Sequence, residues 1–261
     1  NNSMGNIKYK KRRYEDAATY YTTAMELRKA IASKDEDGNV EDPSCREELV
    51  GLYTNLGRSF FQMKLLDESM KCFHKANRIL MLEPQKCERS IASNWTQMGK
   101  VRCKQGQYQD ARELYSDALK LEKKAASSSD VDNHTILLLR HNIAMSYCKE
   151  GQYMKGLEIM EHLLEREKKA NGRSSLYAAK IYLDMCTIHL NLGNKSKMLS
   201  LLKTSSHILD ERKIPENHPF MRERKSLQMK AEGVKKDMKF VSPLATKSYM
   251  RQKKTSLFCG F

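Results

Sequence analysis

Carboxamide side chains recur along this chain at nearly equal distances. Asn55, Gln97 and Asn142 are separated by 42 and 45 residues. A carboxamide carries both a hydrogen-bond donor and an acceptor, so it can satisfy the N–H and C=O groups of a peptide bond whatever the neighbouring side chains are. Residues of this type at one recurring position are therefore chemically suited to hold a peptide backbone.

Basic side chains follow these amides at the same spacing. Two positions, three and seven residues after the amide, are each basic in two consecutive repeats: Arg58 with Lys100, and Lys104 with Lys149. Such a stripe would grip Asp, Glu or phosphate through charge-assisted hydrogen bonds. The alternative interpretation is a merely solvated helix face. The candidate binding surface comprises Asn55, Arg58, Gln62, Gln97, Lys100, Lys104, His141, Asn142 and Lys149.

A second basic patch lies near the start of the chain, beside an expected break between two helices. We expect this patch to be solvated or to contact something acidic. It consists of Lys8, Lys10, Lys11, Arg12 and Arg13.

The motifs that accompany enzymatic chemistry are missing from the sequence. It has no P-loop, GxGxxG, HExxH, GxSxG or zinc-ligand spacing. The seven histidines are scattered, and no acid or cysteine completes a ligand set around His134 and His141. The sequence therefore predicts a protein that is not an enzyme, with no catalytic residue, metal site, cofactor or small-molecule substrate.

The stretch from Trp95 to Leu119 predicts the elements that position these side chains. Trp95, Met98, Gly99 and Arg102 share one face of a first helix, Gly106 breaks it, and a second helix opens at Tyr108. Large and small residues then alternate, as two closely interlocking helices require: Ala111, Tyr115 and Ala118.

This stretch resembles the tetratricopeptide repeat, whose pattern is W-x2-L-G-x2-Y in the first helix and A-x3-F in the second. Arg102 departs from it, because the family prefers an aromatic residue there. About five such units are predicted, and their matching small residues are 52, 42, 45 and 42 residues apart: Gly5, Gly57, Gly99, Ala144 and Cys186. The usual period is about 34 residues.

Repeats of this greater length resemble those of kinesin light chains and spindle-orientation adaptors. That resemblance implies an all-α, right-handed superhelical solenoid in which the first helices line a concave groove. It also implies that Asn55, Gln97 and Asn142 form a ladder clamping the backbone of an extended peptide. Asp184 replaces the amide in the fifth unit, which puts binding there in doubt.

The expected organisation has five parts. Residues 1–32 form a partial first unit, 33–48 an acidic loop and 49–209 units two to five. A capping helix follows at 218–239, where Phe220, Leu227 and Met238 could cover the exposed end of the stack. Residues 240–261 form an extended basic and aromatic tail.

Composition narrows the range of partners and compartments. The net charge is +15, of which residues 212–261 contribute +9; this balance favours acidic partners. No apolar run is long enough for a membrane helix, so no membrane insertion is expected. The seven cysteines, an odd number without a CxxC pair, indicate packed, reduced thiols and thus a reducing, cytoplasmic setting.

The sequence as a whole predicts a non-enzymatic scaffold or adaptor that binds an extended acidic segment of another protein. A cytoskeletal, ciliary or motor-linked assembly is the setting that the kinesin-light-chain resemblance suggests. Two alternatives remain: a nucleic-acid or anionic-surface binder acting through the basic C-terminal region, and a regulatory arm of a larger enzyme or complex.

Overall fold

The computed structural model describes residues 1–32, 42–125 and 134–237, without the side chains of 234–237. Eleven α-helices and no strand lie in these ranges, which confirms the predicted all-α class. The helices are α1 (Asn2–Lys10), α2 (Tyr14–Ile31), α3 (Pro43–Gln62), α4 (Leu66–Leu80), α5 (Glu88–Lys104), α6 (Tyr108–Ala125), α7 (His134–Lys149), α8 (Tyr153–Asn171), α9 (Leu176–Asn191), α10 (Lys195–Glu211) and α11 (Pro219–Asp237).

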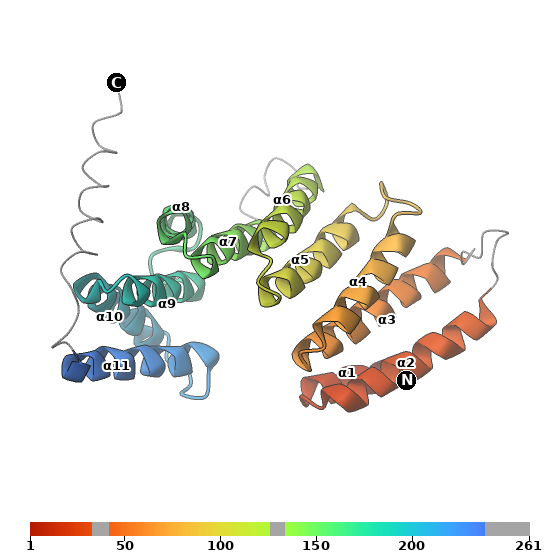
Figure 1. The fold of residues 1–261 in the computed structure, drawn as a ribbon, viewed down its shortest axis with the longest axis horizontal. Coiled ribbons are helices and arrows are strands. Elements are labelled where there is room, and N and C mark those ends of the chain that lie inside the picture. The colour runs from red at the N-terminus through yellow and green to blue at the C-terminus, as the bar shows by residue number, and fades with distance from the viewer. Residues whose placement is uncertain (33–41, 126–133, 238–261) are drawn as a thin grey trace, which may run out of the picture. The chain divides into compact units, whose positions relative to one another are not determined.

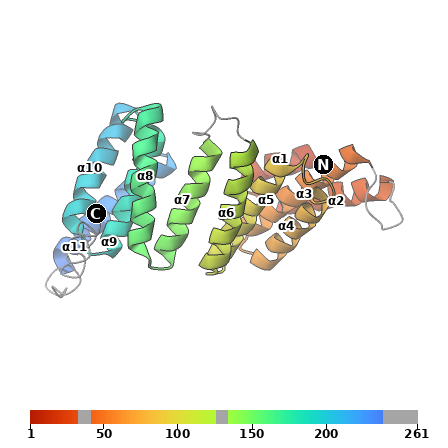
Figure 2. The same ribbon diagram turned by 90° about the horizontal axis from the view of Figure 1, so that it is seen from above.

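The chain divides within α7 into two compact units, one ending at Ser146 and the other starting at Tyr147. In the first unit α1 packs on α2, α3 on α4 and α5 on α6, and each pair also contacts the next (Figure 1). In the second unit α9 packs on α8 and α10, and α11 contacts both α9 and α10 (Figure 2). Consecutive packed helices are the architecture of a helical-repeat solenoid, as predicted.

Close approach of the two helices in a pair depends on a small residue facing a large ring. In the pair formed by α5 and α6, Ala111, Tyr115 and Ala118 are almost completely buried. A methyl group added at Gly57 would lie 2.8 Å from the Phe73 ring, too close for an ordinary van der Waals contact. The predicted alternation of small and large residues is therefore what lets the helices interlock.

The turn inside each helix pair uses a residue with a left-handed backbone conformation. Gly106 lies in the turn after α5 with φ +81°, and α6 begins two residues later, at Tyr108. The equivalent residue of the preceding pair is Lys64, with φ +64°. Glycine adopts this conformation without the steric cost that lysine carries, which is why Gly106 was readable as a helix break.

The connectors and the cap differ in detail from the expected boundaries. Asp42 accepts hydrogen bonds from the N–H groups of Ser44 and Cys45, so residues 43–48 of the predicted loop are the first turns of α3. Helix α11 occupies the predicted capping segment; Leu227 is buried and Phe220 half-buried, together with the buried Met221. Met238 and the predicted tail lie outside the described residues, as does most of the acidic loop.

Six cysteines fall in the described ranges, and each has a free thiol. Four are buried and two are half-buried, in keeping with the packing role expected from the sequence. No described helix is both long and apolar enough to cross a membrane.

Candidate functional site

The candidate binding surface of the first unit is carried by α3 and α5, the first helices of two successive repeats. Asn55, Gln97 and Lys100 are half-buried on these helices. Arg58, Gln62 and Lys104 are exposed, and the last two end their helices. The recurring positions found in the sequence thus map to equivalent places on two helices whose Cα traces approach each other.

Helix α1 extends this surface through an amide–amide contact. The Asn55 Nδ2 atom donates to Asn6 Oδ1 at 3.4 Å, and the Tyr21 hydroxyl donates to the same oxygen at 2.8 Å. The short bond from Tyr21, a buried ring, holds the Asn6 side chain in place. Among the described residues the side-chain Nδ2 group of Asn6 and the side-chain Oδ1 atom of Asn55 make no hydrogen bond, so both side-chain amides keep capacity for a peptide group.

Two cations stand together beside these amides. The Arg58 guanidinium lies over the Tyr9 ring, 5.3 Å from its centroid. Burial, and secondarily the charge of Arg58, lowers the pKa of Lys100. Neither cation forms an ion pair with a carboxylate of the described residues. The neighbourhood therefore has positive charge that the first unit does not neutralise.

The predicted surface continues less completely beyond α5. His141 and Asn142 are half-buried on α7, still in the first unit. Lys149 is exposed at the end of α7 and belongs to the second unit. The structure therefore brings Asn55, Arg58 and Lys100 together with α1, whereas Lys149 belongs to the second unit.

The equivalent amide position of the fifth repeat is blocked by an internal ion-pair network. Asp184 is only 3% exposed and pairs with Lys180 at 2.8 Å. Lys180 also pairs with Glu223 of α11 at 3.0 Å. The carboxylate that replaces the amide in this repeat is thus engaged within the protein.

Sequence reasoning left two contributors out of the site, Asn6 and Tyr9. Asn6 follows Gly5 as Arg58 follows Gly57, so its repeat position was a usable signal. Tyr9 had no such signal, because its role depends on where the Arg58 side chain extends.

The N-terminal basic patch is partly neutralised. Lys8 and Arg13 both pair with Asp16, at 3.7 and 2.5 Å. Lys10, Lys11 and Arg12 are exposed, and Arg12 has φ +60° at the turn between α1 and α2. Part of the patch is therefore paired with Asp16, and the rest is exposed to solvent.

Among the described residues no group of three His, Cys, Asp or Glu side chains is placed to hold a metal ion. The chemistry available on α1, α3 and α5 is recognition: amides for peptide groups and cations for anions.

Comparisons with known proteins agree with this architecture. A sequence profile of the tetratricopeptide repeat matches residues 50–79, which span most of α3 and α4. No protein with a curated description is significantly similar in sequence.

Solved structures share the fold at low sequence identity. The repeats of a protein described as a kinesin light chain of Podosopora anserina align with a TM-score of 0.65 and 14% identity, over 82% of this chain and 95% of that one. BtubC (BKLC) from P. vanneervenii aligns with a TM-score of 0.63 and 12% identity, over 82% and 80% of the two chains. The Rap conjugation gene regulator of the plasmid pLS20, solved in complex with the Phr* peptide, aligns with a TM-score of 0.65 and 14% identity, over 94% of this chain and 59% of its own.

Proposed function

Because this chain is a tetratricopeptide-repeat protein, we propose that it is a non-enzymatic scaffold that binds an extended, acidic segment of another protein. The segment lies across the surface formed by α1, α3 and α5, which we call the first-helix surface and define by Asn6, Tyr9, Asn55, Arg58, Gln97 and Lys100. Amides on this surface hold the backbone of the segment, and the two cations hold a carboxylate side chain.

The observation that carries this proposal is the pairing of two unneutralised cations. Lys100 is half-buried next to Arg58, and burial together with that neighbouring charge lowers its pKa. Keeping two like charges together without a carboxylate costs free energy in the unliganded protein. An anionic side chain would remove this cost and make charge-assisted hydrogen bonds to both groups.

The amides supply the part of recognition that does not depend on ligand sequence. Asn6 and Asn55 are already joined at 3.4 Å, so little side-chain freedom is lost when they bind a peptide group. Gln97 lies at the equivalent position of the next repeat. The same fold accommodates a peptide in one solved relative, the Rap regulator with its Phr* peptide.

A cytoplasmic, cytoskeleton- or motor-linked setting is the part of the proposal that rests on likeness to neighbours. It is supported by the structural similarity to a kinesin light chain and to BtubC. The free thiols of the described cysteines suit a reducing compartment.

The test begins with a random peptide display library selected on the immobilised full chain. Selected peptides are then titrated by fluorescence anisotropy against wild type, Asn55→Ala and Lys100→Glu. Lys71→Glu is the matched charge control, because Lys71 is exposed on α4 and makes no described ion pair. We expect the selected peptides to be acidic. Their affinity should fall about tenfold or more in Lys100→Glu and less in Asn55→Ala. The affinity of Lys71→Glu should be near that of wild type.

Equal losses with Lys100→Glu and Lys71→Glu would contradict a defined site, because they would show a response to net charge alone. A second control, Lys253→Glu/Lys254→Glu, addresses the basic C-terminal region. If binding disappears only in this control and at high salt, the anionic-surface alternative replaces the proposal.

A further inference from the structure

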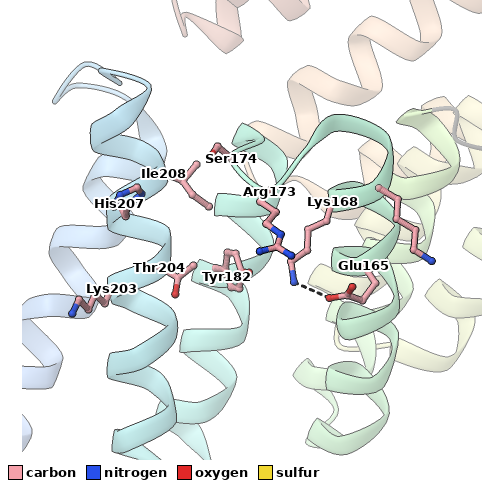
Figure 3. Close-up of a pocket in the computed structure, with 10 residues that line it drawn as sticks. Glu165, Lys168, Arg173, Ser174, Tyr182, Lys203, Thr204, His207 and Ile208 are labelled. Atoms are coloured by element: carbon pink, nitrogen blue, oxygen red, sulfur yellow. Dashed lines mark hydrogen bonds and ion pairs between the residues drawn. The ribbon is translucent and has the colours of Figure 1, made fainter.

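The second unit contains a hollow of about 850 Å³ on the side of its second helices. It is bounded by the end of α8, the connection to α9, and the facing sides of α9 and α10 (Figure 3). Four side chains of its lining are cations and one is a carboxylate: Lys168, Lys169, Arg173 and Lys203, against Glu165. The hollow is separate from the first-helix surface, which belongs to the other unit.

Only one of the four cations is neutralised locally. Lys168 donates to Glu165 at 2.7 Å and lies 6.0 Å from the centroid of the Tyr182 ring. Arg173, from the connection between α8 and α9, and Lys168, near the end of α8, both line the hollow (Figure 3). Within the described ranges no carboxylate forms an ion pair with Lys169, Arg173 or Lys203, so the lining keeps an excess of positive charge.

An equivalent tyrosine in the first unit shows why space remains here. Tyr53 precedes Gly57 by four residues, as Tyr182 precedes Cys186. Lysines from two helices cover the Tyr53 ring, Lys29 at 5.2 Å and Lys75 at 5.8 Å. In the second unit Lys168 takes the place of Lys29, but the shorter Thr204 takes the place of Lys75. One side of Tyr182 is therefore left open.

The polar groups around the opening are held in place and can still accept or donate. The Thr204 hydroxyl donates to the Ser200 carbonyl at 3.2 Å, and the Ser174 hydroxyl donates to Glu211 at 2.8 Å. Arg212 Nε donates to the Ser174 carbonyl oxygen, which ties the α8–α9 connection to the end of α10. The rim that carries Arg173 is thus braced against α10.

Size and charge together define the ligand. A volume of about 850 Å³ is in the range of small-molecule sites, roughly 300–1,000 Å³. The excess positive charge of the lining favours a ligand that concentrates negative charge, and a phosphate group carries up to about two charges on three acceptor oxygens. Arg173 adds a planar fork suited to phosphate. We infer that this hollow binds a compact, multiply phosphorylated small molecule.

Such a ligand could be a soluble polyphosphate or the phosphorylated headgroup of a lipid, since the groups contacted are the same. The probe for the first is inositol hexakisphosphate, titrated into the full chain by calorimetry. The probe for the second is a phosphatidylcholine vesicle containing phosphatidylinositol bisphosphate, used in co-sedimentation.

Two variants test the site, one through charge and one through space. Arg173→Glu reverses an unpaired cation, and we expect inositol hexakisphosphate to bind about tenfold more weakly or worse. Thr204→Trp fills the opening without changing charge and should weaken binding to a similar extent. Thr23→Trp is its matched control, because Thr23 has the same repeat position, is exposed, and makes the same bond to the carbonyl four residues earlier. Lys71→Glu is the charge control, and thermal melting verifies that each variant is folded.

Saturable one-to-one binding that both variants weaken and both controls retain would support the site. If the vesicles also bind, and the same variants weaken that binding, the ligand is a lipid headgroup. If only the soluble probe binds, the ligand is a free small molecule. Absence of saturable binding to either probe would overturn the inference, as would equal losses in Lys71→Glu. Tighter binding of a polyglutamate peptide than of inositol hexakisphosphate, with the same variant dependence, would overturn it in favour of an acidic protein segment.

Discussion

The ring of Tyr115 packs directly against the backbone of Gly99. A methyl group added at Gly99 would lie 2.5 Å from Tyr115 Cε1, a distance that real side chains do not tolerate. Tyr115 is fully buried between α5 and α6, so its ring cannot move aside freely. Gly99→Ala should therefore destabilise the fold by about 2 kcal/mol, in spite of the higher helix propensity of alanine. Urea denaturation of the full chain measures this.

Gly51 provides the opposite case within the same experiment. It lies in the interior of α3, is exposed, and has no atom within 4 Å of an added methyl group. Gly51→Ala should stabilise the protein by roughly 0.5–1 kcal/mol. A Gly99→Ala protein as stable as Gly51→Ala would show that the helices can separate without loss.

Lys180 joins α9 to α11, pairing with Asp184 and with Glu223. Burial disfavours its charge, but the two carboxylates more than offset this, and the pKa of Lys180 is raised. Lys180→Met would leave Asp184 buried without this counter-ion, and we expect a loss of about 2 kcal/mol, reduced from fully buried cases by the partial exposure of Lys180. Glu223→Gln, which leaves Lys180 paired with Asp184, should cost less. Equal effects in urea denaturation would contradict this order.

Lys100 should lower stability in the free protein. Its pKa is lowered in the folded state, so in the range between that value and the ordinary lysine pKa of about 10.4 the unfolded chain binds more protons. Stability due to this group therefore rises with pH across that range, and the penalty is fully present at neutral pH. Lys100→Met, which keeps an apolar stem, should stabilise the protein at pH 7 by a few tenths to about 1 kcal/mol.

The advantage of Lys100→Met should shrink as the pH rises from the lowered folded-state pKa of Lys100 toward the ordinary lysine pKa of about 10.4, because the wild-type ammonium group loses its proton in that range. Parallel urea titrations at pH 7 and 10 measure the difference. A Lys100→Met protein less stable than wild type at pH 7 would mean that the cation has a stabilising partner.

The buried cysteines should resist alkylation in the native protein. Burial raises the pKa of Cys72 and Cys148 to about 11 and that of Cys186 to about 12, which leaves almost no thiolate at neutral pH. Cys87 and Cys103 are half-buried, so iodoacetamide should label them first. Peptide mass spectrometry over a time course measures the order. Labelling of Cys186 as fast as that of Cys87, without denaturant, would contradict the packing around α9.

The local features of the fold were readable from the sequence because each rests on neighbouring residues. Gly106 adopts the left-handed turn that its lack of a side chain permits, and α5 and α6 end and begin around it as predicted. The spacing of Ala111 and Tyr115 placed one face of α6 in the core. The recurring amides and cations lie at equivalent positions of α3 and α5 for the same reason, since helical periodicity decides which face a residue occupies.

Contacts between distant segments were decided only by the tertiary structure. Tyr9 meets Arg58, and Glu223 meets Lys180 across 43 residues, because packing brings together helices that the sequence does not order in space. The hollow beside Tyr182 likewise depends on a residue of another helix, because the short side chain of Thr204 on α10 leaves the space open. Sequence periodicity determined which residues face a neighbouring helix; which partner each one meets, and whether its charge is neutralised, followed from long, flexible side chains in a packed environment.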